Sequence, residues 1–117
     1  MVAVSFELPA LSMVHEERRQ FQRAKTPLSI EIHTEGNAVP SRSQTSDISL
    51  GGCYVETNFT LAVGTRVEVA LWLEDEKITA HAEVVTRHTS FGNGLKFVDI
   101  SDECRNKLVR FLQQVIH

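Results

Sequence analysis

TRVEVALWL, residues 65–73, shows the most regular alternation in the chain. Apolar side chains occupy every second position of it, at Val67, Val69, Leu71 and Leu73. Because successive side chains of a strand point to opposite faces, this spacing predicts a half-buried β-strand. After a charged connection at 74–76, apolar residues alternate again over 78–84, which predicts the return strand of a hairpin. The alternation slips at Val84 and Val85, so we expect a β-bulge there.

Further short strands fill most of the chain on either side of this hairpin. Residues 27–33 alternate in the same way, with apolar side chains at Leu28, Ile30 and Ile32. More strands are predicted at 42–48, 53–57 and 95–97, with a turn at 91–94 before the last of them. About six short strands with closely spaced turns imply a closed antiparallel sheet.

The end of the chain changes to a helical period. Ser101 is a good N-cap residue, and Asp102 and Glu103 suit the positive end of a helix dipole. Apolar side chains then recur at helical spacing, at Cys104, Leu108, Phe111, Leu112 and Val115. We therefore expect an all-β domain over 27–117 whose C-terminal helix lays this stripe on the sheet, after an N-terminal segment over 1–26.

Length, composition and charge narrow the class of protein. With 117 residues, of which 42% are hydrophobic and 23% charged, the chain suits one soluble domain with its own core. Its formal net charge of -3 argues against general binding to DNA or RNA, which needs a basic face. The positive charge is local instead, because four of the 12 basic residues are Arg18, Arg19, Arg23 and Lys25. Such a segment suits a small anion.

Several other functions find no support in the sequence. Cys53 and Cys104 lack the paired spacing of metal or redox sites, and we expect each to be a small buried side chain. The spacings of the five histidines match no common metal site, and no motif indicates a catalytic nucleophile. We therefore expect no metal, no other cofactor and no enzymatic activity. No stretch reaches transmembrane length and residues 1–10 lack the basic start of a signal peptide, so we expect a cytoplasmic protein without membrane insertion.

Two polar clusters carry most of the chemistry. They are an arginine arm with Arg18, Arg19 and Arg23, and a corner between two strands with Asp47, Ser49, Gly51 and Gly52. Arginine forks match the N7 and O6 acceptors of guanine and also chelate phosphate oxygens. Residues two apart on an extended chain share a face, which predicts that the Asp47 and Ser49 side chains lie together. The glycines allow positive φ and a close approach of a ligand to the backbone. Together these groups predict a pocket for a guanine nucleotide.

The two clusters resemble the signature of PilZ domains, R-x-x-x-R followed by [DN]-x-S-x-x-G. The matching residues are Arg19 and Arg23 for the first motif, and Asp47, Ser49 and Gly52 for the second. Arg18 matches the extra arginine often found before the first motif, and residues 92–97 look like the G-x-G-[VL]-x-F segment of the family. The resemblance covers about 16–117, nearly the whole chain.

This resemblance implies a fold, a ligand and a mechanism. The fold is a six-stranded antiparallel β-barrel with a C-terminal α-helix and an N-terminal arm. The ligand is the bacterial second messenger cyclic di-GMP, either one molecule or a stacked pair, and the implied contacts are Arg18, Arg19, Arg23, Asp47, Ser49, Gly51 and Gly52. Like charges keep the arm, residues 15–25, mobile until the ligand phosphates neutralise them. The ordered arm then creates a surface for a downstream protein effector.

Simpler interpretations of the same residues stay open. The arginines also fit a solvated segment, and residues 47–52 fit an ordinary Asx turn. The barrel also fits a ligand-independent protein-interaction module. An oligonucleotide-binding barrel is less favoured, because only 7% of the residues are aromatic. Trp72 lies on the face opposite the apolar residues of its strand. This predicts either an exposed ring that contacts a partner or stacks on a base, or a ring that the N-terminal segment covers.

Overall fold

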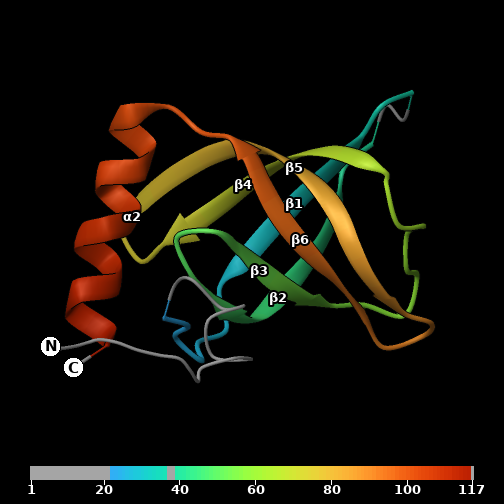
Figure 1. The fold of residues 1–117 in the computed structure, drawn as a ribbon, viewed down its shortest axis with the longest axis horizontal. Helices are drawn as coiled ribbons and strands as arrows, with labels where there is room; N and C mark the ends of the chain where they lie inside the picture. Colours follow the sequence, from blue (N-terminus) through green and yellow to red (C-terminus); the bar gives the residue numbers. More distant parts are fainter. Residues whose placement is uncertain (1–21, 37–38, 117) are drawn as a thin grey trace, which may run out of the picture.

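The computed structural model describes residues 22–36 and 39–116, and Figure 1 shows these residues as a closed barrel with a helix beside one end. The elements are β1 (Ser29–Thr34), β2 (Ser41–Ile48), β3 (Gly52–Glu56), β4 (Arg66–Leu73), β5 (Glu76–His88), β6 (Gly92–Asp99) and α2 (Asp102–Val115). The strand order is β1-β2-β3-β6-β5-β4, and β1 pairs with β4 to close the barrel. All neighbouring strands are antiparallel, so the expected six-stranded barrel is confirmed.

The hairpin of β4 and β5 supplies much of the barrel core. The apolar side chains of both strands are buried as predicted, at Val67, Val69, Leu71, Leu73, Ile78, Ala80, Ala82 and Val84. The predicted bulge is also confirmed, because the register of β5 against β6 shifts between Val84 and Thr86. The extra residue leaves Val84 in the core and turns Val85 toward solvent.

Helix α2 adds its apolar stripe to the same core. The Ser101 hydroxyl caps the helix by accepting a hydrogen bond from the backbone N–H of Cys104 at 3.1 Å. Three of its side chains are buried in the core cluster, Leu108, Phe111 and Leu112. Val115 was expected in this stripe but is 41% exposed. The helix ends there, and the extended residue Ile116 packs against the core instead. Within the described residues, no helix combines the length and the apolar content that crossing a bilayer requires.

The turn between β5 and β6 lies earlier than the glycines predict. A turn was expected at 91–94, but it falls at 88–91, and Gly92 and Gly94 belong to β6. Both glycines serve close packing between strands. A Cβ atom on Gly92 would lie 2.6 Å from the Tyr54 ring, and one on Gly94 would lie 3.1 Å from a side-chain atom of β5. The turn prediction is therefore wrong, because glycine marks crowded strand positions as well as turns.

The two free cysteines should differ in reactivity. Burial raises the pKa of the Cys53 thiol to about 12, whereas a hydrogen bond with the Ser101 side chain lowers the pKa of the half-buried Cys104 thiol. Because the thiolate is the reactive form, we expect iodoacetamide at pH 8 to modify Cys104 and to spare Cys53 in the folded protein. Mass spectrometry of the alkylated chain checks this. Modification of both thiols at equal rates before denaturation would contradict it.

Candidate ligand-binding site

The end of the arginine arm is fastened to β2 by hydrogen bonds. Ala24 and Ile48 exchange both of their backbone N–H to carbonyl bonds, at 2.8 and 3.0 Å. The Thr45 hydroxyl accepts from the N–H of Leu28 at 3.0 Å and donates to the carbonyl of Thr26 at 2.9 Å. Ala24 and Leu28 are buried, so this segment lies against the barrel. The expectation of a mobile arm therefore does not extend to Ala24.

A β-bulge decides which way Asp47 points. The register of β2 against β3 shifts between Thr45 and Asp47, which leaves Ser46 as the extra residue. Thr45 and Ile48 are both buried in the barrel, and Asp47 is partly exposed. In a regular strand Thr45 and Asp47 would share the inner face, because side chains alternate. The bulge therefore turns the Asp47 carboxylate outward.

Arg23 and Asp47 meet in an ion pair on this outer face. Nη1 of Arg23 lies 2.5 Å from Oδ1 of Asp47, and the side chains are 34% and 23% exposed. The bond uses one of the five N–H donors of the guanidinium, which leaves others for a ligand. The structure thus brings together one residue from each predicted cluster. Arg18 and Arg19, the other arginines of the predicted arm, lie outside the described residues.

The corner after β2 is held by the side chain of Ser49. Its hydroxyl accepts from the N–H of Gly51 at 3.1 Å, and its backbone N–H donates to the carbonyl of Gly52 at 2.8 Å. Ser49 is 3% exposed, so its hydroxyl is turned into the corner. Ser49 directly follows Ile48, the last residue of β2, and the expectation that its side chain shares a face with Asp47 stays a prediction.

The corner glycines are not needed for unusual backbone angles. Among the described glycines, positive φ occurs at Gly36 and Gly64, so that expectation is wrong for Gly51 and Gly52. Gly52 has a different requirement. A Cβ atom there would lie 2.0 Å from the backbone carbonyl oxygen of Leu95 on β6. Glycine at this position therefore permits the close approach of β3 to β6.

Sequence reasoning missed three residues around the ion pair. Ala24 and Thr45 anchor the arm, and Tyr54 is the cross-strand partner of Asp47 in the pairing of β2 with β3. Alternation predicts which side chains are buried but not which strands pair. The neighbours of Asp47 could therefore be found only from the register.

Other polar and aromatic groups lie apart from this pair. Trp72 is half-buried. The ammonium of Lys77 lies 5.5 Å from its ring centre, in a cation–π contact. Arg42 pairs with Glu31 at 2.5 Å.

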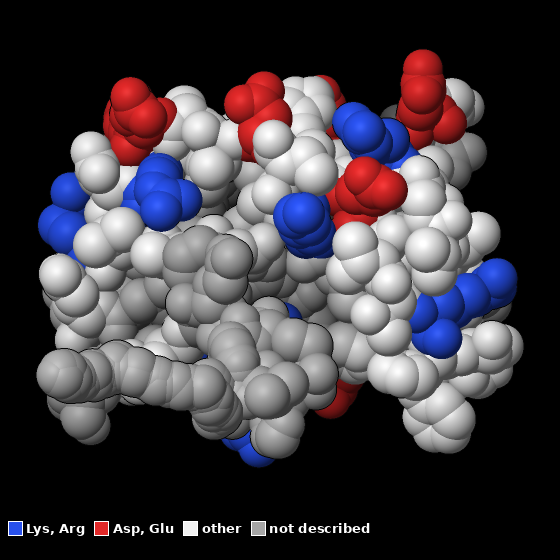
Figure 2. Space-filling model, in the orientation of Figure 1, with Lys and Arg blue, Asp and Glu red and all other residues white. Residues whose placement is uncertain are grey.

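Figure 2 shows Asp and Glu side chains along the upper edge of the visible face, with Lys and Arg between and below them. The described part of this face has no continuous basic band of the kind that binds nucleic acids. In residues 22–36 and 39–116, no three His, Cys, Asp or Glu side chains are placed to hold a metal ion.

A comparison with protein families identifies the domain. The model of the PilZ domain matches residues 17–114, which include the arginines of the arm, the corner and most of α2. The chain belongs to the PilZ domain family. None of the curated proteins compared with the chain matches it in sequence.

Solved PilZ-like structures share the fold. MotI/DgrA, the inhibitor of motility of Bacillus subtilis, superposes with a TM-score of 0.71 and 20% identity over 83% of this chain and 50% of that chain. The present chain thus spans about half the length of that protein. The PilZ domain of YcgR from Escherichia coli, solved with c-di-GMP, has a TM-score of 0.69 and 18% identity, over 84% and 91%. The PilZ domain of CeSA from a cellulose-synthesizing bacterium has a TM-score of 0.64 and 18% identity, over 82% and 99%.

Proposed function

We propose that this PilZ domain is a cytoplasmic receptor for cyclic di-GMP and acts as a binding module rather than an enzyme. The observation that carries the proposal is the Arg23–Asp47 ion pair, in which an arginine of the first motif contacts the acid of the second. The two residues are 24 positions apart in sequence, so the fold has to bring them together. Family membership and the likeness to the YcgR domain, which was solved with c-di-GMP, support the choice of ligand.

The pair offers both kinds of hydrogen bond that guanine requires. The Arg23 fork donates to the N7 and O6 acceptors, and the Asp47 carboxylate accepts from the N–H donors of the ring. Arg18 and Arg19 precede Arg23 by five and four residues in the sequence and supply charge for the two phosphates. Ser49 and the backbone of Gly51 and Gly52 complete the proposed contacts at the corner.

Cyclic di-GMP should bind at least about tenfold more tightly than cyclic di-AMP, because adenine leaves a site built for guanine donors and acceptors unpaired. Isothermal titration calorimetry of the full chain at fixed ionic strength measures both ligands. Equal affinities would show that only the phosphates are recognised. No heat from cyclic di-GMP beyond that of dilution would refute the receptor and favour the alternative, a ligand-independent PilZ-like interaction module.

We further propose that the ligand orders the arm and so creates a surface for a downstream protein effector. Arg18, Arg19 and Arg23 repel one another until phosphates lie between them. Ala24 is already bonded to Ile48, so the ordering concerns the residues before it. The new surface then combines the arm, the ligand and the outer face of the barrel.

Hydrogen exchange should slow in residues 15–22 and in the corner at 46–53 when cyclic di-GMP is added. Mass spectrometry of peptides from these two segments measures the change. Helix α2 is the internal control, since it packs on the core and should show little difference. Unchanged exchange in 15–22 at saturating ligand would rule out the ordering mechanism, while the receptor function would stand on the calorimetry alone.

A further inference from the structure

Tyr54 lies beside the ion pair on the outer face of the barrel. It is the cross-strand partner of Asp47 on one side and of Gly94 on the other. Directly opposed residues of antiparallel strands point to the same face, with Cβ atoms roughly 4.5–5.5 Å apart. Because the bulge at Ser46 turns Asp47 outward, the Tyr54 side chain projects from β3 next to the carboxylate that pairs with Arg23.

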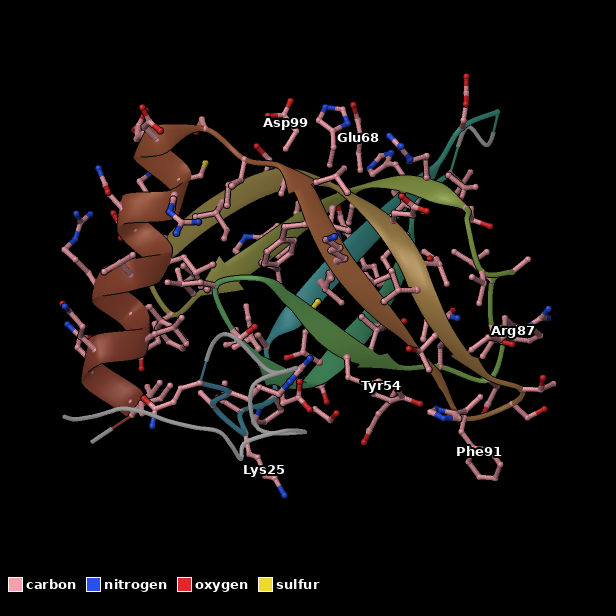
Figure 3. All side chains as sticks on the ribbon, in the orientation of Figure 1. Lys25, Tyr54, Glu68, Arg87, Phe91 and Asp99 are labelled. Carbon is pink, nitrogen blue, oxygen red and sulfur yellow. The ribbon has the colours of Figure 1, made fainter. Side chains whose placement is uncertain are left out.

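The ring of Tyr54 is held in one place by the strand beneath it and by a hydrogen bond. A Cβ atom on Gly92 would lie 2.6 Å from Cε2 and 2.8 Å from Cζ of the ring, so the ring packs against the bare backbone of that glycine. The Tyr54 hydroxyl lies 2.8 Å from Nδ1 of His88, and the two ring centres are 5.8 Å apart. In the view of Figure 3, Tyr54 lies between Lys25 of the arm and Phe91 in the β5–β6 turn.

An aromatic ring over a strand glycine also has a structural use, because it covers backbone that would otherwise face water. Two features of Tyr54 are not needed for covering the glycine. A hydrogen bond to His88 fixes the ring, and the side chain stays partly exposed next to the charged pair. A ring that is held in this way and only partly buried is a preorganised surface for a planar group such as a purine base.

We propose that the outer face of the Tyr54 ring is a stacking subsite for one guanine base of the ligand. The proposal rests on the function proposed above and deepens it: Arg23 and Asp47 bind polar groups of the ligand, and Tyr54 binds the flat face of a base. Such stacking tolerates either purine, since every base has a π-face. Tyr54 therefore adds affinity, whereas Arg23 and Asp47 provide the selectivity for guanine.

The test uses the fact that Tyr54 is the one tyrosine of the chain. In protein labelled on its tyrosine ring, the Tyr54 proton signals should move upfield when cyclic di-GMP is added, because a stacked guanine shields them. Calorimetry should show that Tyr54→Phe, which keeps the ring, binds within about threefold of wild type. Tyr54→Leu, which still covers Gly92 but has no π-face, should bind on the order of tenfold more weakly.

The outcomes separate the subsite from the receptor function. If the wild-type chain binds cyclic di-GMP but the ring signals stay in place, the stacking proposal is overturned and the receptor stands, even if Tyr54→Leu binds weakly. Equal affinity of Tyr54→Leu and wild type overturns it as well. If the wild-type chain does not bind cyclic di-GMP at all, the subsite falls together with the proposed function. Thermal unfolding of Tyr54→Phe and Tyr54→Leu shows whether both are folded, and the wild-type NMR titration requires no variant.

Discussion

Gly52→Ala should lower the free energy of unfolding by about 3 kcal/mol or more. The new methyl carbon would lie 2.0 Å from the backbone carbonyl oxygen of Leu95, and its position is fixed by the backbone of residue 52, which is paired with β6 in the barrel. Neither atom can rotate away as a side chain would, so β3 has to move from β6. Since a small domain is stable by roughly 5–15 kcal/mol, such a loss is a large part of the total. Urea unfolding followed by circular dichroism measures it.

The matched control is Gly64→Ala. Gly64 has a φ of 95° and no heavy atom within 4 Å of an added Cβ, so only backbone strain opposes the change. That strain costs about 1–2 kcal/mol. If Gly52→Ala is no more destabilising than Gly64→Ala, the close approach of β3 to β6 does not explain the glycine. A ligand contact at Gly52 would then be the better reason for its place in the motif.

Much of the barrel could be predicted because burial in a strand leaves a trace in the sequence. The alternation over 65–73 and 78–84 exists because one face of β4 and β5 lines the core, and the slip at Val84 marks the bulge. The cap at Ser101 could be predicted for the same kind of reason, since the hydroxyl satisfies a local backbone donor. These features depend on neighbours within a few residues.

The errors arise where distant strands decide the role of a residue. Gly92 suggests a turn by itself, but it is required by the Val55 carbonyl and the Tyr54 ring on the neighbouring strand. Ser46 shows no sign of being an extra residue, because a bulge is defined against the partner strand. The motifs singled out Arg23 and Asp47, which the fold brings together, whereas Tyr54 and the anchor at Ala24 depend on strand pairing.

The double substitution Arg19→Ala with Arg23→Ala should weaken cyclic di-GMP binding by about 100-fold or more. Each single change should cost more than tenfold, since a hydrogen bond to a charged group contributes roughly 1.5–3 kcal/mol. Circular dichroism should stay native, because Arg23 is partly exposed and pairs with Asp47 outside the core. Calorimetry of wild type, the two single variants and the double variant gives the coupling free energy between the two arginines in ligand binding.

Two further variants show whether charge or geometry is responsible. Arg23→Lys keeps the charge but loses the planar fork, so it should bind nearly as weakly as Arg23→Ala if the fork holds guanine. Arg66→Ala is the matched control, because it removes an exposed arginine that pairs with Glu83 at 3.4 Å on the β4–β5 side of the barrel. Its affinity should equal that of wild type. If Arg23→Ala also binds like wild type, the ion pair with Asp47 stabilises only the arm, and the binding site lies elsewhere. If Arg23→Lys restores full affinity, the arginine acts as a point charge on phosphate, and the recognition of guanine falls to other groups.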